Sequence, residues 1–249
     1  MKRSIVKLSL GMALLAVAYS CSKDDGNTPD PQAATCDDGI QNGDETGVDC
    51  GGSACAPCAV DNILEGDVTT DVTLDAAIGY ELAGAYVVRS GASLTIPAGT
   101  VISATGGTSA YIAVERGAQI FINGNASAPV VMTSGSSNPA PGDWGGLVVC
   151  GDAPTNKGSN VTSEVADLTY GGSNANDNSG SIRYLRVEYT EATFSNDKEF
   201  NGVSLFGVGA GTTFEYVQSY QGGDDGIEFF GGTVSGDYLV STGSGDDSI

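Results

Sequence analysis

The chain has no histidine, and this absence excludes a large part of enzyme chemistry. Among its 249 residues there is no His, one Trp and only three Met. Without imidazole there can be no Ser-His or Cys-His nucleophile pair and no zinc site built on histidine. Carboxylates and arginines are the remaining candidates for acid, base or metal-binding roles.

Basic residues are also scarce. The sequence has 10 Lys and Arg against 31 Asp and Glu, so its formal net charge is −21. A surface with this balance repels nucleic acid and anionic lipid headgroups. We therefore expect no nucleic-acid partner, and we expect cations or neutral or basic ligands instead.

Long apolar runs are absent except for one near the start. Leu8–Ala18 is an apolar stretch of 11 residues, which is too short to span a bilayer. It follows three basic residues, Lys2, Arg3 and Lys7. This order is typical of a secretory leader, so residues 1–20 are predicted to be a signal peptide rather than a folded element.

The end of this leader resembles a bacterial lipobox. Small residues precede Cys21, although Tyr19 is bulky and the usual Leu is missing, and an ordinary secretory signal is the alternative. An acylated Cys21 would anchor the mature chain to the outer-membrane lipid. Ser22–Asp25 resembles the surface-export signal of Bacteroidota lipoproteins, which implies display at the cell surface. Residues 21–35 have no apolar period and are predicted to be a flexible tether.

Four cysteines define a short module over residues 36–58, and they are Cys36, Cys50, Cys55 and Cys58. Export to an oxidising compartment favours two disulfides, and four thiolates on zinc are the alternative. Three disulfide pairings are possible. The module has too few apolar residues for a core, so cross-links must hold it together.

The same module resembles a Cys-rich motif of secreted Bacteroidota proteins, Asp-Gly-Ile-Gln-Asn-Gly-Asp-Glu-Thr-Gly, on residues 38–47. Its side-chain oxygens on Asp38, Asn42, Asp44 and Asp49 could ligate Ca²⁺. Their spacing is not that of an EF-hand. The alternative is that these residues simply form turns.

An internal repeat organises the rest of the chain. Glu215–Ser219 returns 22 residues later as Asp237–Ser241, and Asn201–Gly207 aligns with Asp225–Gly231. A period in the twenties indicates a solenoid, and the Val, Ile, Tyr, Phe and Gly content favours strands. We predict an all-β fold, a parallel β-helix over residues 59–249. The chain stops inside a coil, which suggests a fragment of a longer protein.

Other segments of the coil follow from the same alignment. Tyr86–Ile96 matches Ile112–Ile122 at a shift of 26, and Leu147, Val203 and Ile227 are expected in one column. Residues 152–180 break the period and are predicted to be an insertion loop, where function often lies. Cys150 falls in a strand and is interpreted as a small buried residue rather than a nucleophile.

Stacking of coils would bring two pairs of aspartates together. Asp224 should face Asp246, and Asp225 should face Asp247, because residues one period apart lie about 4.8 Å apart. Four carboxylates at this distance either raise their pKa values or hold a cation. The pattern predicts a calcium site, and a solvated acidic turn is the alternative.

The same acids permit an enzymatic alternative. Asp224, Asp225 and Asp246 could be the acid and base of an inverting glycosidase. A lyase would need Ca²⁺ with Arg183 or Arg186 as base, although Arg183 could instead pair with an acid on the sheet. The absence of histidine and the anionic surface favour a non-catalytic role.

Aromatic residues recur at the coil spacing. They are Trp144, Phe200, Tyr216, Tyr220 and Tyr238. Exposed rings would stack on sugars, whereas buried rings would fill the core. The core role is favoured.

Residues 63–249 resemble one family, the β-helix lipoproteins of Bacteroidota with a pectate-lyase-like right-handed coil. The resemblance rests on Gly91–Thr100, Gly142–Leu147 and Asp224–Gly232. It implies a right-handed parallel β-helix, and the family has no established activity that could be carried over to this chain. We therefore expect a surface-anchored, non-catalytic, adhesin-like module that binds glycans or proteins and is stabilised by Ca²⁺. A polysaccharide lyase or glycoside hydrolase is the alternative.

Overall fold

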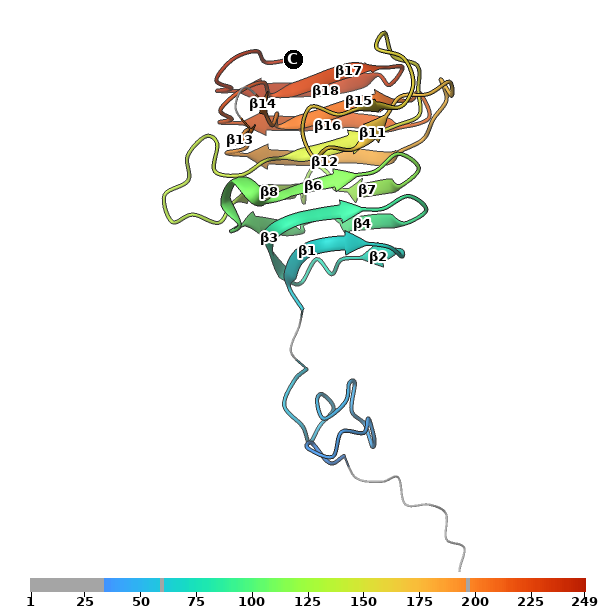
Figure 1. Ribbon diagram of the computed structural model, residues 1–249. Coiled ribbons are helices and arrows are strands. Elements are labelled where there is room, and N and C mark those ends of the chain that lie inside the picture. Colours follow the sequence, from blue (N-terminus) through green and yellow to red (C-terminus); the bar gives the residue numbers. More distant parts are fainter. Residues whose placement is uncertain (1–33, 59–60, 196–197) are drawn as a thin grey trace, which may run out of the picture. The chain divides into compact units, whose positions relative to one another are not determined.

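The computed structural model describes residues 34–58, 61–195 and 198–249 (Figure 1). Contacts divide the chain into two units, residues 1–60 and residues 61–249. The predicted signal peptide, the lipidation site Cys21 and all of the tether up to residue 33 lie outside the described residues. Among the described residues, no helix is long and apolar enough to cross a bilayer.

The described part of the first unit consists of turns held by two disulfides. Cys36 pairs with Cys55, and Cys50 pairs with Cys58. The prediction of disulfides is therefore confirmed, and the zinc alternative is wrong because no thiolate remains. Residues 34–58 bury little apolar surface, so these cross-links replace the core that the segment lacks.

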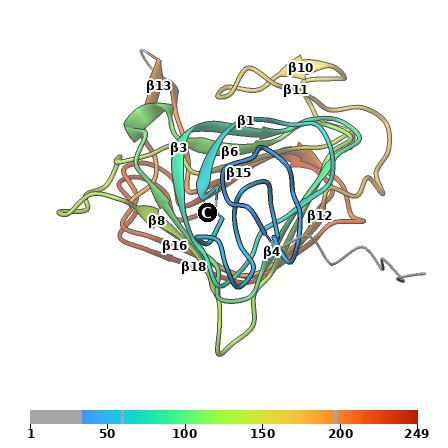
Figure 2. The ribbon, with the colours of Figure 1, turned by 90° about the horizontal axis from the view of Figure 1, so that it is seen from below.

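The second unit is a right-handed parallel β-helix with three faces, as its three-sided outline in Figure 2 shows. Face A is built from β1 (Ile63–Val68), β3 (Gly79–Val88), β6 (Tyr111–Val114), β9 (Leu147–Cys150), β15 (Val203–Val208) and β17 (Ile227–Gly232). Face B contains β2 (Val72–Thr73), β4 (Ser93–Pro97), β7 (Gln119–Asn123) and the first halves of β12 (Gly180–Glu188), β16 (Thr213–Tyr220) and β18 (Gly236–Thr242). Face C contains the first parts of β1 and β3, then β5 (Val101–Ala104), β8 (Val130–Ser134) and the second halves of β12, β16 and β18.

The registers confirm the repeats read from the sequence. Glu215 pairs with Asp237 at a shift of 22, and Leu94 pairs with Ile120 at a shift of 26. Leu147, Val203 and Ile227 form one ladder and are fully buried. Strand side chains alternate, so every second residue of each rung enters the core between the three faces.

A glycine precedes each rung of that ladder, at Gly146, Gly202 and Gly226. Successive coils approach closely at this corner between faces C and A. A Cβ on Gly202 would lie 2.4 Å from the carbonyl oxygen of Gly226. The recurrent Gly before an aliphatic residue in the repeat is therefore a requirement of backbone spacing.

Two antiparallel hairpins leave the coil. The first, β10 (Val161–Thr162) with β11 (Thr169–Tyr170), lies in the insertion predicted at 152–180, and the second pairs β13 (Thr193–Ser195) with β14 (Lys198–Glu199). Figure 2 shows both on the outer side of face A. The first hairpin covers a second hydrophobic cluster that includes Cys150 and Phe206.

Candidate functional site

Three of the four predicted aspartates meet at the corner between faces C and A. Asp224 and Asp225 lie in the turn between β16 and β17, and Asp246 follows β18. Each of the three offers a carboxylate oxygen within 4.8 Å of the others. Asp247 contributes its main chain, because its N–H donates to Oδ1 of Asp225 over 2.8 Å.

The repeat itself creates this cluster. The N–H of Asp246 donates to the carbonyl oxygen of Asp224 over 3.3 Å, so the two turns stack as the strands beside them do. Because the two turns have nearly the same sequence, the same acidic side chains end up at the same height. The acidic turn is thus brought next to its own copy by the coil.

A fourth carboxylate, from Glu191, lies behind these aspartates and was missed in the sequence. Glu191 is 3% exposed, and its carboxylate accepts hydrogen bonds from the N–H of Asp224 and from the Thr190 hydroxyl. It lies between β12 and β13, outside the repeat, and its φ is +79°. No repeat or motif marks Glu191, so only the fold reveals it.

Burial and the nearby negative charges raise the pKa values of Glu191 and Asp224. Burial raises the pKa of Glu191 to about 7, partly opposed by the hydrogen bond from Asp224. The pKa of Asp224 rises to about 6, first through burial and then through the charges of Asp225, Glu199 and Asp246. Oxygen donors that repel one another suit a hard cation such as Ca²⁺.

The arginines suggested as bases are already engaged. Arg183 pairs with Glu215 on the neighbouring coil, as expected for a surface ion pair. Arg186 pairs with Glu188, and its guanidinium lies 4.4 Å from the centre of the Tyr220 ring. Both guanidiniums are held by carboxylates on the strands of the coil.

The aromatic residues divide between core and surface. Trp144 and Phe200 are fully buried, and Nε1 of Trp144 donates to the carbonyl oxygen of Glu188 over 2.8 Å. Tyr216 stacks between Tyr184 and Tyr238, with ring centroids 4.3 Å apart on both sides.

These three tyrosines turn the corner between faces B and C, each with positive φ. Of them, Tyr238 is 68% exposed. The core role therefore holds for Trp144 and Phe200, whereas the tyrosines stack on each other along the outer edge of the coil.

Cys150 is fully buried in β9, beneath the first hairpin. Burial raises the pKa of its thiol to about 12, so the thiolate is disfavoured. The interpretation of Cys150 as a structural residue is supported.

The side-chain oxygens proposed as calcium ligands in the N-terminal unit accept hydrogen bonds within its turns. Oδ1 of Asp49 accepts hydrogen bonds from the N–H groups of Asp38 and Gly39, over 2.8 and 2.9 Å. Asp38 accepts from the side chains of Thr35 and Asn42, and Asp44 accepts from the N–H of Ser53. The hydrogen bonds that Asp38 accepts lower its pKa, and the bond from the Thr35 hydroxyl has the largest effect. The turn-forming alternative is favoured over a calcium site.

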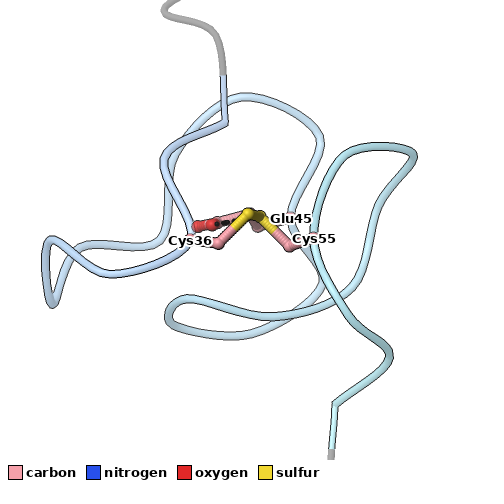
Figure 3. Close-up of side chains that lie close together, drawn as sticks. All are labelled: Cys36, Glu45 and Cys55. Carbon is pink, nitrogen blue, oxygen red and sulfur yellow. Dashed lines mark hydrogen bonds between the residues drawn. A yellow bond between two sulfur atoms is a disulfide. The ribbon is translucent and has the colours of Figure 1, made fainter.

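A buried carboxylate lies against one disulfide of this unit (Figure 3). Oε1 of Glu45 is 3.1 Å from Sγ of Cys55, and its other oxygen accepts from the N–H of Asn42 over 2.9 Å. Cys36, Glu45 and Cys55 have the proximity of a metal site. The disulfide leaves no thiolate to serve as a ligand, so the group acts as a structural turn.

The family model described as a pectate-lyase like beta helix domain matches residues 66–249. No curated protein and no solved structure matches the chain.

Proposed function

The chain belongs to the pectate-lyase-like β-helix family, and from this premise we propose that it is a surface-anchored, non-catalytic module that binds glycans or proteins. In this role the β-helix is a rigid, adhesin-like support, and loops on its outer faces make the contacts. A calcium ion at Asp224, Asp225 and Asp246 would stabilise the last two coils of the described β-helix.

Export and anchoring are supported by the N-terminal sequence and by the disulfides. The leader and the lipobox-like residues before Cys21 fit lipid attachment at the outer membrane. Two disulfides in residues 34–58 fit an oxidising compartment outside the cytoplasm. The resemblance of Ser22–Asp25 to a surface-export signal supports display at the cell surface.

One observation carries the non-catalytic proposal. The aspartate oxygens lie within 4.8 Å of one another, whereas inverting glycosidases separate their carboxyl groups by about 6.5–9.5 Å to admit water beside the sugar. This spacing suits a cation better than a sugar ring.

A second candidate, a polysaccharide lyase or glycoside hydrolase, is favoured by the raised pKa of Glu191, since acid catalysts have such values. Glu191 is only 3% exposed and bonds the main chain of Asp224, so a substrate does not reach it. Arg183 is paired with Glu215 and Arg186 with Glu188, so neither arginine offers a free guanidine group to act as the base of a lyase.

The test is a panel of polysaccharides offered to the full chain. We expect retention of one or more glycans on immobilised protein, with no new reducing ends and no unsaturated products. Product release that is lost in Asp225→Asn would instead establish the enzyme. Absence of binding to every glycan, and to proteins extracted from neighbouring cell surfaces, would refute the binding role.

A further inference from the structure

A groove lies on the outer side of face A, between the two hairpins that leave the coil. Its lining comes from the first hairpin, from Lys198 on β14 and from two strands of face A, and it encloses a cavity of about 280 Å³. A second cavity of about 200 Å³ shares Lys157, Tyr170 and Phe230 with it and adds Phe229. The two cavities therefore form one groove, which we call the hairpin groove.

Both lysines of the described β-helix lie in this groove, and neither forms an ion pair with a described residue. Each of the four described arginines, in contrast, is paired with a carboxylate. Lys157 and Lys198 both line the same cavity. In a chain of net charge −21, two ammonium groups in a cavity that holds one carboxylate, Glu164, give a local site for an acidic group.

The floor of the groove is aromatic. Phe206 and Phe230 are stacked on adjacent rungs, with centroids 4.0 Å apart and planes 11° apart. Tyr170 packs against Phe206 at 5.1 Å. Phe206 and Tyr170 are buried, whereas Phe230 is half-buried and Phe229 is 36% exposed. Phe230 thus presents a ring that is already held in place, as sugar-binding sites require.

The remaining lining is hydrogen-bonding. Thr162 and Glu164 line the same cavity. Ser163 lines it as well, but its hydroxyl is buried and is already bonded to the main chain of Val165 and Leu168. The Thr162 hydroxyl and the Glu164 carboxylate accept hydrogen bonds from sugar hydroxyls, while Glu164 would repel a simple anion such as phosphate. An acidic peptide would offer more negative charge and no ring for Phe230. The combination of a ring, one hydroxyl, one carboxylate and two ammonium groups matches a sugar that carries one acidic group.

We propose that the hairpin groove binds a singly acidic sugar within an otherwise neutral glycan, an inference that rests on the proposed binding role. The ring of the sugar lies against Phe230, and its carboxylate or sulfate lies between Lys157 and Lys198. A densely charged polyanion binds less well, because beyond the two lysines it meets the negative surface of the chain. The cavity of about 280 Å³ is at the lower end for ligand sites, about 300 Å³, and suits one sugar unit.

The test uses oligosaccharides in matched pairs, with and without their acidic group. The probes are 3′-sialyllactose and 6′-sulfolactose against lactose, glucuronic acid against glucose, and polygalacturonate and a poly-glutamate peptide as polyanions. Calorimetric titration of the full chain is expected to show at least one acidic member binding about tenfold more tightly than its neutral parent. It should also bind more tightly, per acidic residue, than either polyanion.

Two kinds of variant locate the binding. Lys157→Gln and Lys198→Gln should each remove most of the acidic preference, while Phe230→Ala should weaken the acidic and the neutral sugar alike. Arg183→Gln removes the same charge from face B and should leave binding unchanged. Melting temperatures of all variants report whether each one is folded.

The outcomes separate this inference from the binding role itself. Equal binding of each acidic sugar and its neutral parent, or an acidic preference that survives both lysine variants, overturns the groove while glycan binding stands. Preference for poly-glutamate overturns the sugar in favour of an acidic peptide. Absence of all binding refutes the proposed function along with the groove.

Discussion

The main-chain N–H of Asp247 donates to Oδ1 of Asp225 over 2.8 Å, although 22 residues separate the two. The bond joins an acidic turn to its own repeat on the next coil. It helps to hold the carboxylates of Asp224, Asp225 and Asp246 close together. The period of the sequence therefore determines how much negative charge gathers at the site.

Calcium is expected to stabilise the β-helix. At a free concentration of 100 times its Kd, a cation bound only to the folded state adds about 2.7 kcal/mol to the free energy of unfolding. For a chain of this size, a gain of this kind raises the melting temperature by several degrees. Calorimetry at pH 8 with Ca²⁺ and then with a chelator measures it. The increase should vanish in Asp246→Asn and persist in Asp237→Asn, which changes an exposed acid on β18 outside the cluster.

Identical melting curves with Ca²⁺ and with the chelator would leave the acidic turn as a solvated surface. An increase retained by Asp246→Asn would place the ion elsewhere.

The calcium-free protein should be more stable at pH 5 than at pH 8. The pKa of Glu191 is raised by burial from 4.5 to about 7 in the folded state. An acid with a raised pKa contributes stability that is present below its unfolded pKa and is lost as the pH rises through its folded pKa. For Glu191 this loss is at most about 3 kcal/mol. Urea unfolding at several pH values should show the decline, and Glu191→Gln should flatten it.

Asp224 adds a smaller contribution of the same sign, because it is partly exposed and solvent screens its charge. Calcium should reverse the trend, since protonated carboxylates do not bind the ion. A free energy of unfolding that rises from pH 5 to pH 8 without calcium would contradict the buried state of Glu191.

Gly202→Ala should destabilise the coil by about 1–3 kcal/mol, the usual effect of inserting an atom into a packed site. Its Cβ would lie 2.4 Å from the carbonyl oxygen of Gly226, which belongs to the next coil and does not rotate away. Gly79→Ala is the matched control, because nothing lies within 4 Å of its Cβ. Equal melting temperatures for the two variants would show that the corner accommodates a Cβ at position 202 without steric conflict.

Loss of the disulfides should affect the first unit alone. In Cys50→Ser with Cys58→Ser, the loop closed by Cys50–Cys58 is freed, and residues 34–58 have no core to replace it. Limited proteolysis should then cut within 34–58 while the melting temperature of the β-helix stays unchanged. A matching loss in the β-helix would mean that the two units unfold together.

The parallel β-helix could be predicted because its repeat is local and periodic. Val203 and Ile227 stand one period apart, whereas the insertion at 152–180 separates Leu147 from Val203. Their shared column could still be read, because each of the three follows a glycine in a similar motif. The pairing of Asp225 with the turn at Asp247 follows from the same period. Contacts between residues one period apart can therefore be predicted from the sequence alone.

The parts outside the repeat could not be predicted in the same way. Glu191 reaches the aspartates from a loop whose path is fixed by main-chain bonds to Trp144 and Gly145, and no sequence pattern indicates those bonds. Lys157 and Lys198 are 41 positions apart by their numbers and converge only because two irregular hairpins fold onto one face. The pairing of four cysteines also required three-dimensional geometry, since spacing alone allowed three solutions.

The two hairpins leave the coil after one strand and return to the next without disturbing the registers above and below them. β9 still pairs with β15, and β12 still pairs with β7 and β8, although the whole first hairpin lies between β9 and β12 in the chain. Evolution can therefore lengthen, shorten or exchange these excursions while the scaffold stays the same. Grafting the segment between Cys150 and Gly180 onto another coil of this architecture would carry over the first hairpin but not Lys198 or Phe230, which line the hairpin groove from other parts of the chain.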